Sequence, residues 1–224
     1  MIRVGAATID ITPPVGLAMA GFAARTSGAL GDHDALTVRA LVVEDTAVVT
    51  IDVIGVDADF SARARARISL PDLAITIAAT HTHGGPVSML GRLFAEADPT
   101  FIHRIEDAVV QAVDRAITDR KPAHLLGGVG LEPGFAHNRR RSDGPVDAGI
   151  PVLRFESAQG STIAVLVSYA CHPVVLGADN LNWTSDYPHF VREKIENAFP
   201  GAIAIFATGC AGDVNTGHSA AASL

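Results

Sequence analysis

The fold and the site are both decided by one stretch, Ile75-Thr-Ile-Ala-Ala-Thr-His-Thr-His-Gly-Gly-Pro86. Residues 73–80 are apolar and rich in β-branched side chains, which predicts a buried strand. The chain then places His81 and His83 directly before a Gly-Gly-Pro sequence, which cannot continue a central strand. Ligands bind at the carboxyl ends of strands in open α/β sheets, so this stretch predicts two imidazoles at a ligand-binding edge.

The spacing of His81 and His83 suits joint action. If the strand continues through both residues, the two rings point to the same face, because side chains alternate with period two. Neutral imidazole is the commonest metal ligand, so the pair can chelate a metal, or one ring can bind it while the other acts beside it. The alternative is that both are ordinary polar loop residues. An isolated His-X-His motif does not decide between the two.

Composition predicts a large buried core. The chain has 224 residues, of which 48% are hydrophobic and 18% are charged. Aromatic residues make up only 5%, which favours many short buried strands and closely packed helices. The net charge of −7 argues against nucleic acid or an anionic membrane as a partner, because both select basic patches.

The expected location is the cytoplasm. Residues 2–12 alternate like a strand, where a secretory signal would have a charged segment followed by a long apolar run. No run approaches the roughly 18 apolar residues of a membrane span, so no integral membrane segment is expected. Cys171 and Cys210 are too few for a disulfide framework at this length. The sequence leaves a homo-oligomer open.

Strand and helix patterns alternate along the first half of the chain. They predict strands at residues 3–12, 36–43, 47–56 and 73–80, a hairpin turn at 44–46, a helix at 57–69 and a long loop at 16–34. A strand, a helix and a strand within about 35 residues form a βαβ unit. The strands at 47–56 and 73–80 should therefore be parallel.

The second half continues the alternation. It predicts a long helix opened by Asp98-Pro99, strands at 123–129, 152–155, 162–170 and 202–207, a polar loop at 134–149 and a helix capped by Thr184-Ser185-Asp186. Residues 1–224 are thus expected to form a single mixed α/β domain, with partly parallel sheets layered with helices and a ligand site at the carboxyl ends of strands. No helix is predicted after residue 215 to cover the last strand, so we expect the first part of a larger domain.

Two further loops repeat the pattern seen at His81. His172 follows the strand at 162–170 and precedes a proline, and the segment Gly209–Asn215 follows the strand at 202–207. Parallel packing would bring these strand ends together. Core histidines do not usually lie at strand exits beside Gly and Pro, so the repetition favours a metal or catalytic cluster.

Several of these segments resemble, in order, the motifs of the neutral/alkaline ceramidase family. The matching segments are Val4–Pro13, Gly31–Leu36 with Arg39-Ala40, Ala79-Thr-His-Thr-His-Gly-Gly-Pro86, Asn138-Arg139, Cys171-His172-Pro173 and Phe206–Asn215. Together they cover nearly the whole chain.

The resemblance implies a zinc-dependent amide hydrolase that cleaves an N-acyl bond with a metal-activated water. It implies His81 as the first zinc ligand and His172 as the second. It also implies that His83 and Arg139 hold the substrate carbonyl or the oxyanion that develops from it. This chemistry is consistent, because zinc lowers the pKa of bound water toward 7 and a nearby donor stabilises charge that appears in the transition state.

The chain departs from the family pattern in two places. Asn215 stands where the family has its active-site serine, a change that a metal–water mechanism survives and a serine-dependent one does not. The family's other zinc ligands, a glutamate and a tyrosine, are expected beyond residue 224. Asp213 or Asp186 could approach the metal, with Asp186 favoured as a helix cap, and Cys171 and Cys210 could be ligands or buried packing residues.

The expected substrate is a small soluble amide or N-acyl compound, because the sequence shows neither an export signal nor an apolar platform for ceramide. A second hypothesis is a non-catalytic protein that binds a ligand or partner at the same cleft. A nucleotide-binding α/β domain is a third, ranked last because no Gly-X-Gly-X-X-Gly or P-loop sequence follows any strand.

Overall fold

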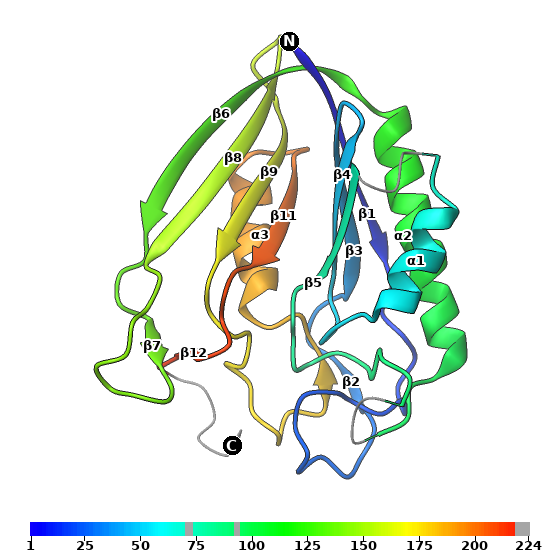
Figure 1. Ribbon diagram of the computed structural model, residues 1–224, viewed down its shortest axis with the longest axis vertical. Coiled ribbons are helices and arrows are strands. Elements are labelled where there is room, and N and C mark those ends of the chain that lie inside the picture. Colours follow the sequence, from blue (N-terminus) through cyan, green and yellow to red (C-terminus); the bar gives the residue numbers. More distant parts are fainter. Residues whose placement is uncertain (70–73, 92–94, 218–224) are drawn as a thin grey trace.

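The chain is built around one strongly curved β-sheet. The computed structural model describes residues 1–69, 74–91 and 95–217. The strands of the sheet are, in chain order, β1 (Ile2–Asp10), β3 (Thr37–Val43), β4 (Thr46–Ile51), β5 (Ile75–Ala79), β6 (Lys121–Leu131), β8 (Gly149–Ser157), β9 (Thr162–Tyr169) and β11 (Ile203–Thr208). Their order across the sheet is β11-β9-β8-β6-β1-β3-β4-β5 (Figure 1).

Within the described residues, three helices and two small strand pairs complete the fold. The helices are α1 (Ala58–Ala66), α2 (Pro99–Thr118) and α3 (Tyr187–Ala198), and the small pairs join β2 (Gly31–Asp32) to β10 (Asn182–Trp183) and β7 (Ala136–Asn138) to β12 (Val214–Thr216). Helix α2 packs on β1, β3 and β4 with α1 beside it, while α3 packs on β11 (Figure 1). The mixed α/β fold predicted from the sequence is confirmed.

Local sequence signals explain most of these elements. Strands β3 and β4 form the predicted antiparallel hairpin, and β4 and β5 pair in parallel on either side of α1, as a βαβ unit requires. Helix α2 begins at Pro99 because the Asp98 carboxylate accepts a hydrogen bond of 2.9 Å from the Phe101 amide. Its predicted apolar stripe, including Ile105 and Val109, is buried.

The predicted strand at residues 47–56 is wrong beyond Ile51. The chain leaves the sheet at Asp52, whose side chain is completely buried in a polar cluster. The carbonyl oxygens of Val53 and Ile54, which a longer strand would pair with a neighbour, instead accept hydrogen bonds from His81. The strand is short because its continuation supports the histidine loop. Residue 73, at the start of the strand predicted at 73–80, lies outside the described residues.

The two edges of the sheet, β5 and β11, meet. Thr208 at the end of β11 donates a hydrogen bond to the Thr80 carbonyl just after β5, and Arg39 on β3 donates to the Ala204 carbonyl over 2.8 Å. An apolar cluster fills the space between the two halves of the sheet, β11-β9-β8-β6 and β1-β3-β4-β5. It is made of Val4, Ala6, Leu41, Ala123, Phe155, Ala164 and Ile205. Strand β9 pairs in parallel with β11, so the carboxyl ends of β5, β9 and β11 point to one place although they come from opposite ends of the strand order.

A buried ion pair spans the same junction. Arg192 on α3 donates from both terminal nitrogens to the Asp52 carboxylate, over 2.8 and 2.9 Å, and neither side chain is more than 2% exposed. Burial alone would raise the pKa of Asp52, but Arg192 and the two donors of Thr37 hold it below its usual value. The pair therefore joins the end of β4 to the helix that covers β11.

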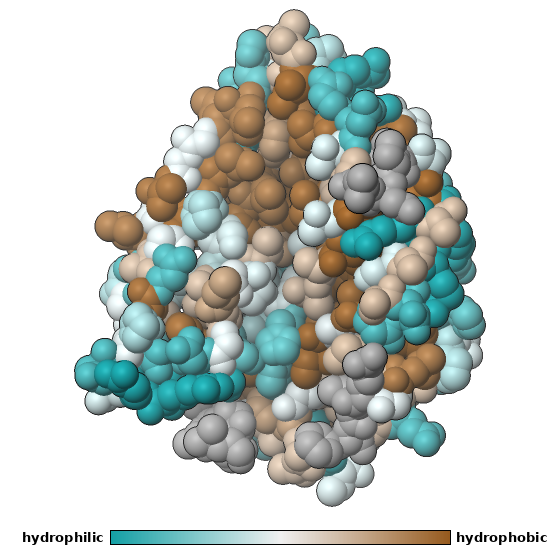
Figure 2. Space-filling model, in the orientation of Figure 1, coloured by the Kyte–Doolittle hydropathy of each residue, from teal (hydrophilic) through white to brown (hydrophobic). Residues whose placement is uncertain are grey.

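Strand β6 presents apolar side chains to solvent. Leu125, Leu126, Val129 and Leu131 are 42–79% exposed, and brown surface lines the hollow between the two halves of the sheet (Figure 2). Beyond Ala123, β6 pairs only with β8 among the described residues, which leaves its other edge open. The sequence predicted a shorter strand here because glycines interrupt the apolar pattern. Among the described residues, no helix is long and apolar enough to span a membrane.

We predict that Arg192→Met lowers the free energy of unfolding by about 3–5 kcal/mol, because it leaves the Asp52 charge buried without its partner. Urea denaturation checks this, with Arg104→Met at an exposed site on α2 as the control that changes little. A loss in Arg192→Met no larger than in the control would contradict the role given to the ion pair.

Candidate metal centre

Three histidines meet where the strand ends converge. His81 and His83 follow β5, and His172 follows β9, and each offers a ring nitrogen within 4.8 Å of the others. The ring centroids lie 4.6 Å apart for His81 and His172, 5.2 Å for His81 and His83, and 5.3 Å for His83 and His172. The convergence predicted from the three loops is therefore present in the structure.

The backbone fixes which nitrogen of each ring carries the proton. Nδ1 of His81 lies 2.6 Å from the Ile54 carbonyl oxygen, and Nδ1 of His172 lies 2.7 Å from the Ala211 carbonyl oxygen. A carbonyl oxygen only accepts, so we assign both protons to Nδ1. The two Nε2 atoms, each with a lone pair, then face each other 2.9 Å apart. Two lone pairs at this distance repel unless a cation lies between them.

The backbone at His81 is strained. Its φ angle is +66°, in the left-handed region that non-glycine residues rarely adopt, and its amide donates to the Val53 carbonyl over 3.1 Å. Such a conformation costs on the order of 1–3 kcal/mol and persists only where surrounding contacts impose it. The strand thus does not run through both histidines, as the simple alternation assumed, although their rings still adjoin.

His83 is uncharged and without a hydrogen-bond partner in the described chain. Burial, followed by the charges of His81, His172 and two arginines, lowers its pKa to about 3. Both ring nitrogens are buried with no hydrogen bond to the described residues. Phe22 packs edge-on at 5.0 Å, and a Cβ atom at Gly21 would lie 2.5 Å from the ring, so only glycine permits this loop to cover His83.

The cluster fits a metal that prefers nitrogen ligands. Metal ligation requires neutral imidazole, and burial also lowers the pKa of His172. Two ligands of a tetrahedral zinc ion lie roughly 3.3 Å apart, so the 2.9 Å pair would need to open by a few tenths of an ångström. The donor set therefore fits zinc and other metals that bind imidazole.

Asn215 on β12 and Arg139, which directly follows β7, lie beside the cluster. The Asn215 backbone pairs with His137 in β7 and bridges to His172, and its side chain is buried. Arg139 is exposed; its amide donates to the Asp213 carbonyl and Nη2 to the Gly212 carbonyl, each over 2.7 Å. Its charge helps to lower the pKa values of His83 and His172, so it acts on the cluster electrostatically.

The other ligand candidates have different surroundings. The Asp186 carboxylate caps α3 and accepts from three backbone amides, as the cap interpretation predicted. Asp213 accepts from Asn138 over 2.9 Å. Cys171 is buried, which raises the pKa of its thiol to about 12, and Cys210 is exposed. None of these four residues belongs to the three-histidine group.

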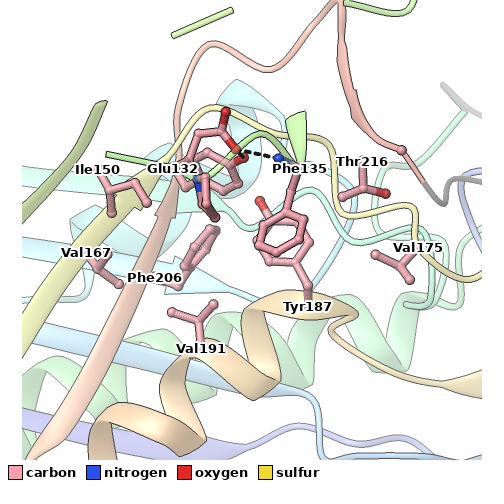
Figure 3. Close-up of a pocket in the computed structure, with 12 residues that line it drawn as sticks. Glu132, Phe135, Ile150, Val167, Val175, Tyr187, Val191, Phe206 and Thr216 are labelled. Atoms are coloured by element: carbon pink, nitrogen blue, oxygen red, sulfur yellow. Dashed lines mark hydrogen bonds between the residues drawn. The ribbon is translucent and has the colours of Figure 1, made fainter. Parts of the chain in front are cut away.

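A separate cavity of about 390 Å³ lies between α3 and the sheet (Figure 3). Its walls are mainly apolar, with Val167, Tyr187 and Phe206 around it and the Phe135 ring at one side. Thr216 lines it, whereas its neighbour Asn215 lies beside His172; adjacent strand residues face opposite ways. None of the three histidines lines this cavity, so it is distinct from the metal site.

Two solved structures share this fold. One is a neutral ceramidase from Pseudomonas aeruginosa, with a TM-score of 0.88 and 22% identity over 96% of this chain and 39% of that chain. The fold is that of part of a ceramidase. A ceramidase complexed with C2 gives a TM-score of 0.86 and 22% identity over 96% of this chain and 38% of that chain. No protein-family model matches the chain.

The likeness confirms the sequence resemblance at the level of the fold. The chain spans about two-fifths of the length of each ceramidase structure. At 22% identity, what the likeness shows is the fold.

We predict that acid destabilises the metal-free protein through His83. Between its ordinary pKa of 6.5 and its folded value of about 3, the unfolded chain binds a proton that the folded chain does not, so stability falls as pH falls. From pH 7 to pH 5, the loss from this residue should be about 2 kcal/mol. Urea unfolding with a chelator present measures it.

His83→Gln should remove that part of the pH dependence, while His103→Gln, on the exposed face of α2, should leave it unchanged. An identical pH dependence in His83→Gln and the unaltered protein would show that His83 is not the buried neutral group described above.

Proposed function

We propose that the chain carries the metal-binding part of a zinc-dependent hydrolase that cleaves an amide bond in an N-acyl compound. The observation that carries the proposal is the pair of Nε2 lone pairs of His81 and His172, which face each other at 2.9 Å in a ceramidase-like fold. His81 and His172 hold the metal in this account. Zinc bound there would polarise the amide carbonyl and lower the pKa of a water molecule toward neutrality.

His83 and Arg139 have the properties needed to bind the substrate carbonyl. Neutral His83 has one N–H donor, and its nitrogens make no competing hydrogen bond in the described chain. Arg139 uses one side-chain nitrogen to hold the Gly212 carbonyl and keeps further donors for a ligand. Both therefore stabilise the negative charge that develops on the carbonyl oxygen.

Asn215 is proposed to bind substrate or water by its side-chain amide. An amide group cannot serve as a nucleophile in acyl transfer in the way that a serine hydroxyl does. Asn215 is buried and bridges to His172, which supports this role. The reaction proposed for this chain therefore depends on the metal and involves no acyl-enzyme at this position.

Two substrate classes, a small soluble amide and a lipid amide, have to be compared. The sequence-based case for a small soluble amide used the lack of an apolar platform, but the structure exposes apolar side chains along β6. That ground for excluding a lipid no longer holds. We retain the small amide as the proposed substrate, supported by Asn215 in place of the family serine. Cytoplasmic location stays a prediction, and a homo-oligomer stays open.

The test measures bound metal and amide hydrolysis together. The zinc-replete protein is expected to hold about one zinc per chain and to release acid from short N-acyl amines faster than from ceramide. His81→Ala and His172→Ala should lose both metal and activity, whereas His103→Ala should keep both. Arg139→Gln should keep the metal and lower kcat by about 100- to 1000-fold, because it removes a donor to the oxyanion.

Absence of zinc in the zinc-replete protein would refute the hydrolase. Zinc binding without hydrolysis of any N-acyl compound would favour the alternative, a non-catalytic protein that binds a ligand at the same cleft. Faster hydrolysis of ceramide than of short amides would reverse the substrate assignment.

We also propose that this chain forms one part of a larger catalytic domain, which would cover the open face of β6. The proposal is supported by the exposure of Val129 and Leu131, at 71% and 79%, and by the two-fifths coverage of the ceramidase structures.

Residues 1–224 alone should bind an apolar fluorescent dye. Val129→Lys should weaken that binding, and Leu90→Lys, at an exposed site outside β6, should not. A discrete dimer that Val129→Lys abolishes would instead assign the face to a second copy.

A further inference from the structure

The Thr-His-Thr-His sequence has two faces with different tasks. His81 and His83 enter the metal cluster, whereas Thr80 and Thr82 are completely buried. Both threonine hydroxyls make hydrogen bonds to groups outside the cluster. The two histidines that enter the cluster thus alternate with two threonines that anchor the loop to the surrounding structure.

Thr80 is tied to the buried ion pair. Its hydroxyl donates to Oδ1 of Asp52 over 3.1 Å, and the same carboxylate accepts from Arg192 and from Thr37. Thr80 directly precedes His81, whose φ of +66° must be imposed by its surroundings. A fixed Thr80 limits the rotations open to the His81 backbone.

Thr82 is tied to the loop before α3. Its hydroxyl donates to the Thr184 carbonyl over 2.8 Å and accepts from the Gly84 amide over 3.0 Å. The Thr184 amide in turn donates to the Gly84 carbonyl over 3.0 Å. This exchange holds the backbone on both sides of His83.

The two anchors belong to one network. Arg192, which binds Asp52, also donates to the Ser185 hydroxyl over 2.7 Å. The Ser185 hydroxyl donates to the Asp34 carboxylate over 3.1 Å, and Thr184 donates to the same carboxylate. Displacement of either threonine would therefore have to deform a buried, charged network, which is costly.

We propose that Thr80 and Thr82 are positioning residues that set the geometry of His81 and His83 through the Asp52–Arg192–Ser185–Asp34 network. The inference rests on the proposed metal site. It assigns the metal affinity of the site partly to hydroxyl groups that touch no metal. Loss of the hydrogen bonds that orient metal ligands typically costs 10- to 100-fold in affinity.

Thr80→Val tests this proposal, because valine keeps the shape of the side chain and removes only the hydroxyl. The chain offers a matched control in Thr50→Val. Thr50 lies on β4, is 1% exposed, and its hydroxyl makes no hydrogen bond to the described residues. The two variants make the same chemical change, but only Thr80→Val removes a hydrogen bond to the network.

Zinc dissociation constants are measured by competition with a chromophoric chelator, alongside thermal unfolding of the metal-free proteins. Thr80→Val and Thr82→Val should each raise the zinc dissociation constant by about 10- to 100-fold. Thr50→Val should leave it unchanged, and Thr80→Ser, which keeps the hydroxyl, should restore it. Thr82→Val tests the proposal if Thr80→Val fails to fold.

Equal zinc affinity in Thr80→Val and Thr50→Val would overturn the inference and leave the metal site standing. A lower unfolding temperature in Thr80→Val with unchanged zinc affinity would also overturn it, because the hydroxyl would then serve only the fold. An unaltered protein that binds no zinc would overturn the proposed function and this inference together.

Discussion

The buried ion pair between Asp52 and Arg192 joins parts of the molecule that the strand order keeps apart. Asp52 directly follows β4, beside one edge of the sheet, and Arg192 lies on the helix that covers β11, the other edge. Taking two charges out of water is costly, and the pair is tolerated because both Asp52 oxygens and both terminal nitrogens of Arg192 are hydrogen-bonded. The pair joins the two edges of the curved sheet. The metal cluster forms where the two edges of the curved sheet are held together.

At that junction, the neutral histidines present ring nitrogens with few hydrogen-bond partners. Backbone carbonyls fix the protons of His81 and His172 on Nδ1, which leaves the two Nε2 atoms opposed. The strain at His81 and the buried nitrogens of His83 add to the cost. These costs, gathered in one place, fit a cluster that could hold a cation.

The sequence identified the histidines of the cluster, but not the contacts that hold the two edges of the sheet together. Strand exits rich in Gly and Pro identified His81, His83 and His172, because such residues end a strand wherever they occur. The curvature that brings β5 and β11 together could not be read from local patterns, since it depends on the order of eight strands. The Asp52–Arg192 contact joins residues 140 positions apart, and Asp52 was assigned to the interior of a strand. Thr80 and Thr82 were recognised as part of a motif, but their task depends on that distant pair.

The central claim is that His81 and His172 share one metal ion. X-ray absorption at the zinc edge of the zinc-loaded protein tests it most directly. The account predicts nitrogen neighbours near 2.0 Å with the outer scattering of at least two imidazole rings, and one ring fewer in His172→Ala. A spectrum with sulfur neighbours, or one without imidazole scattering, would place the metal elsewhere and contradict the assignment.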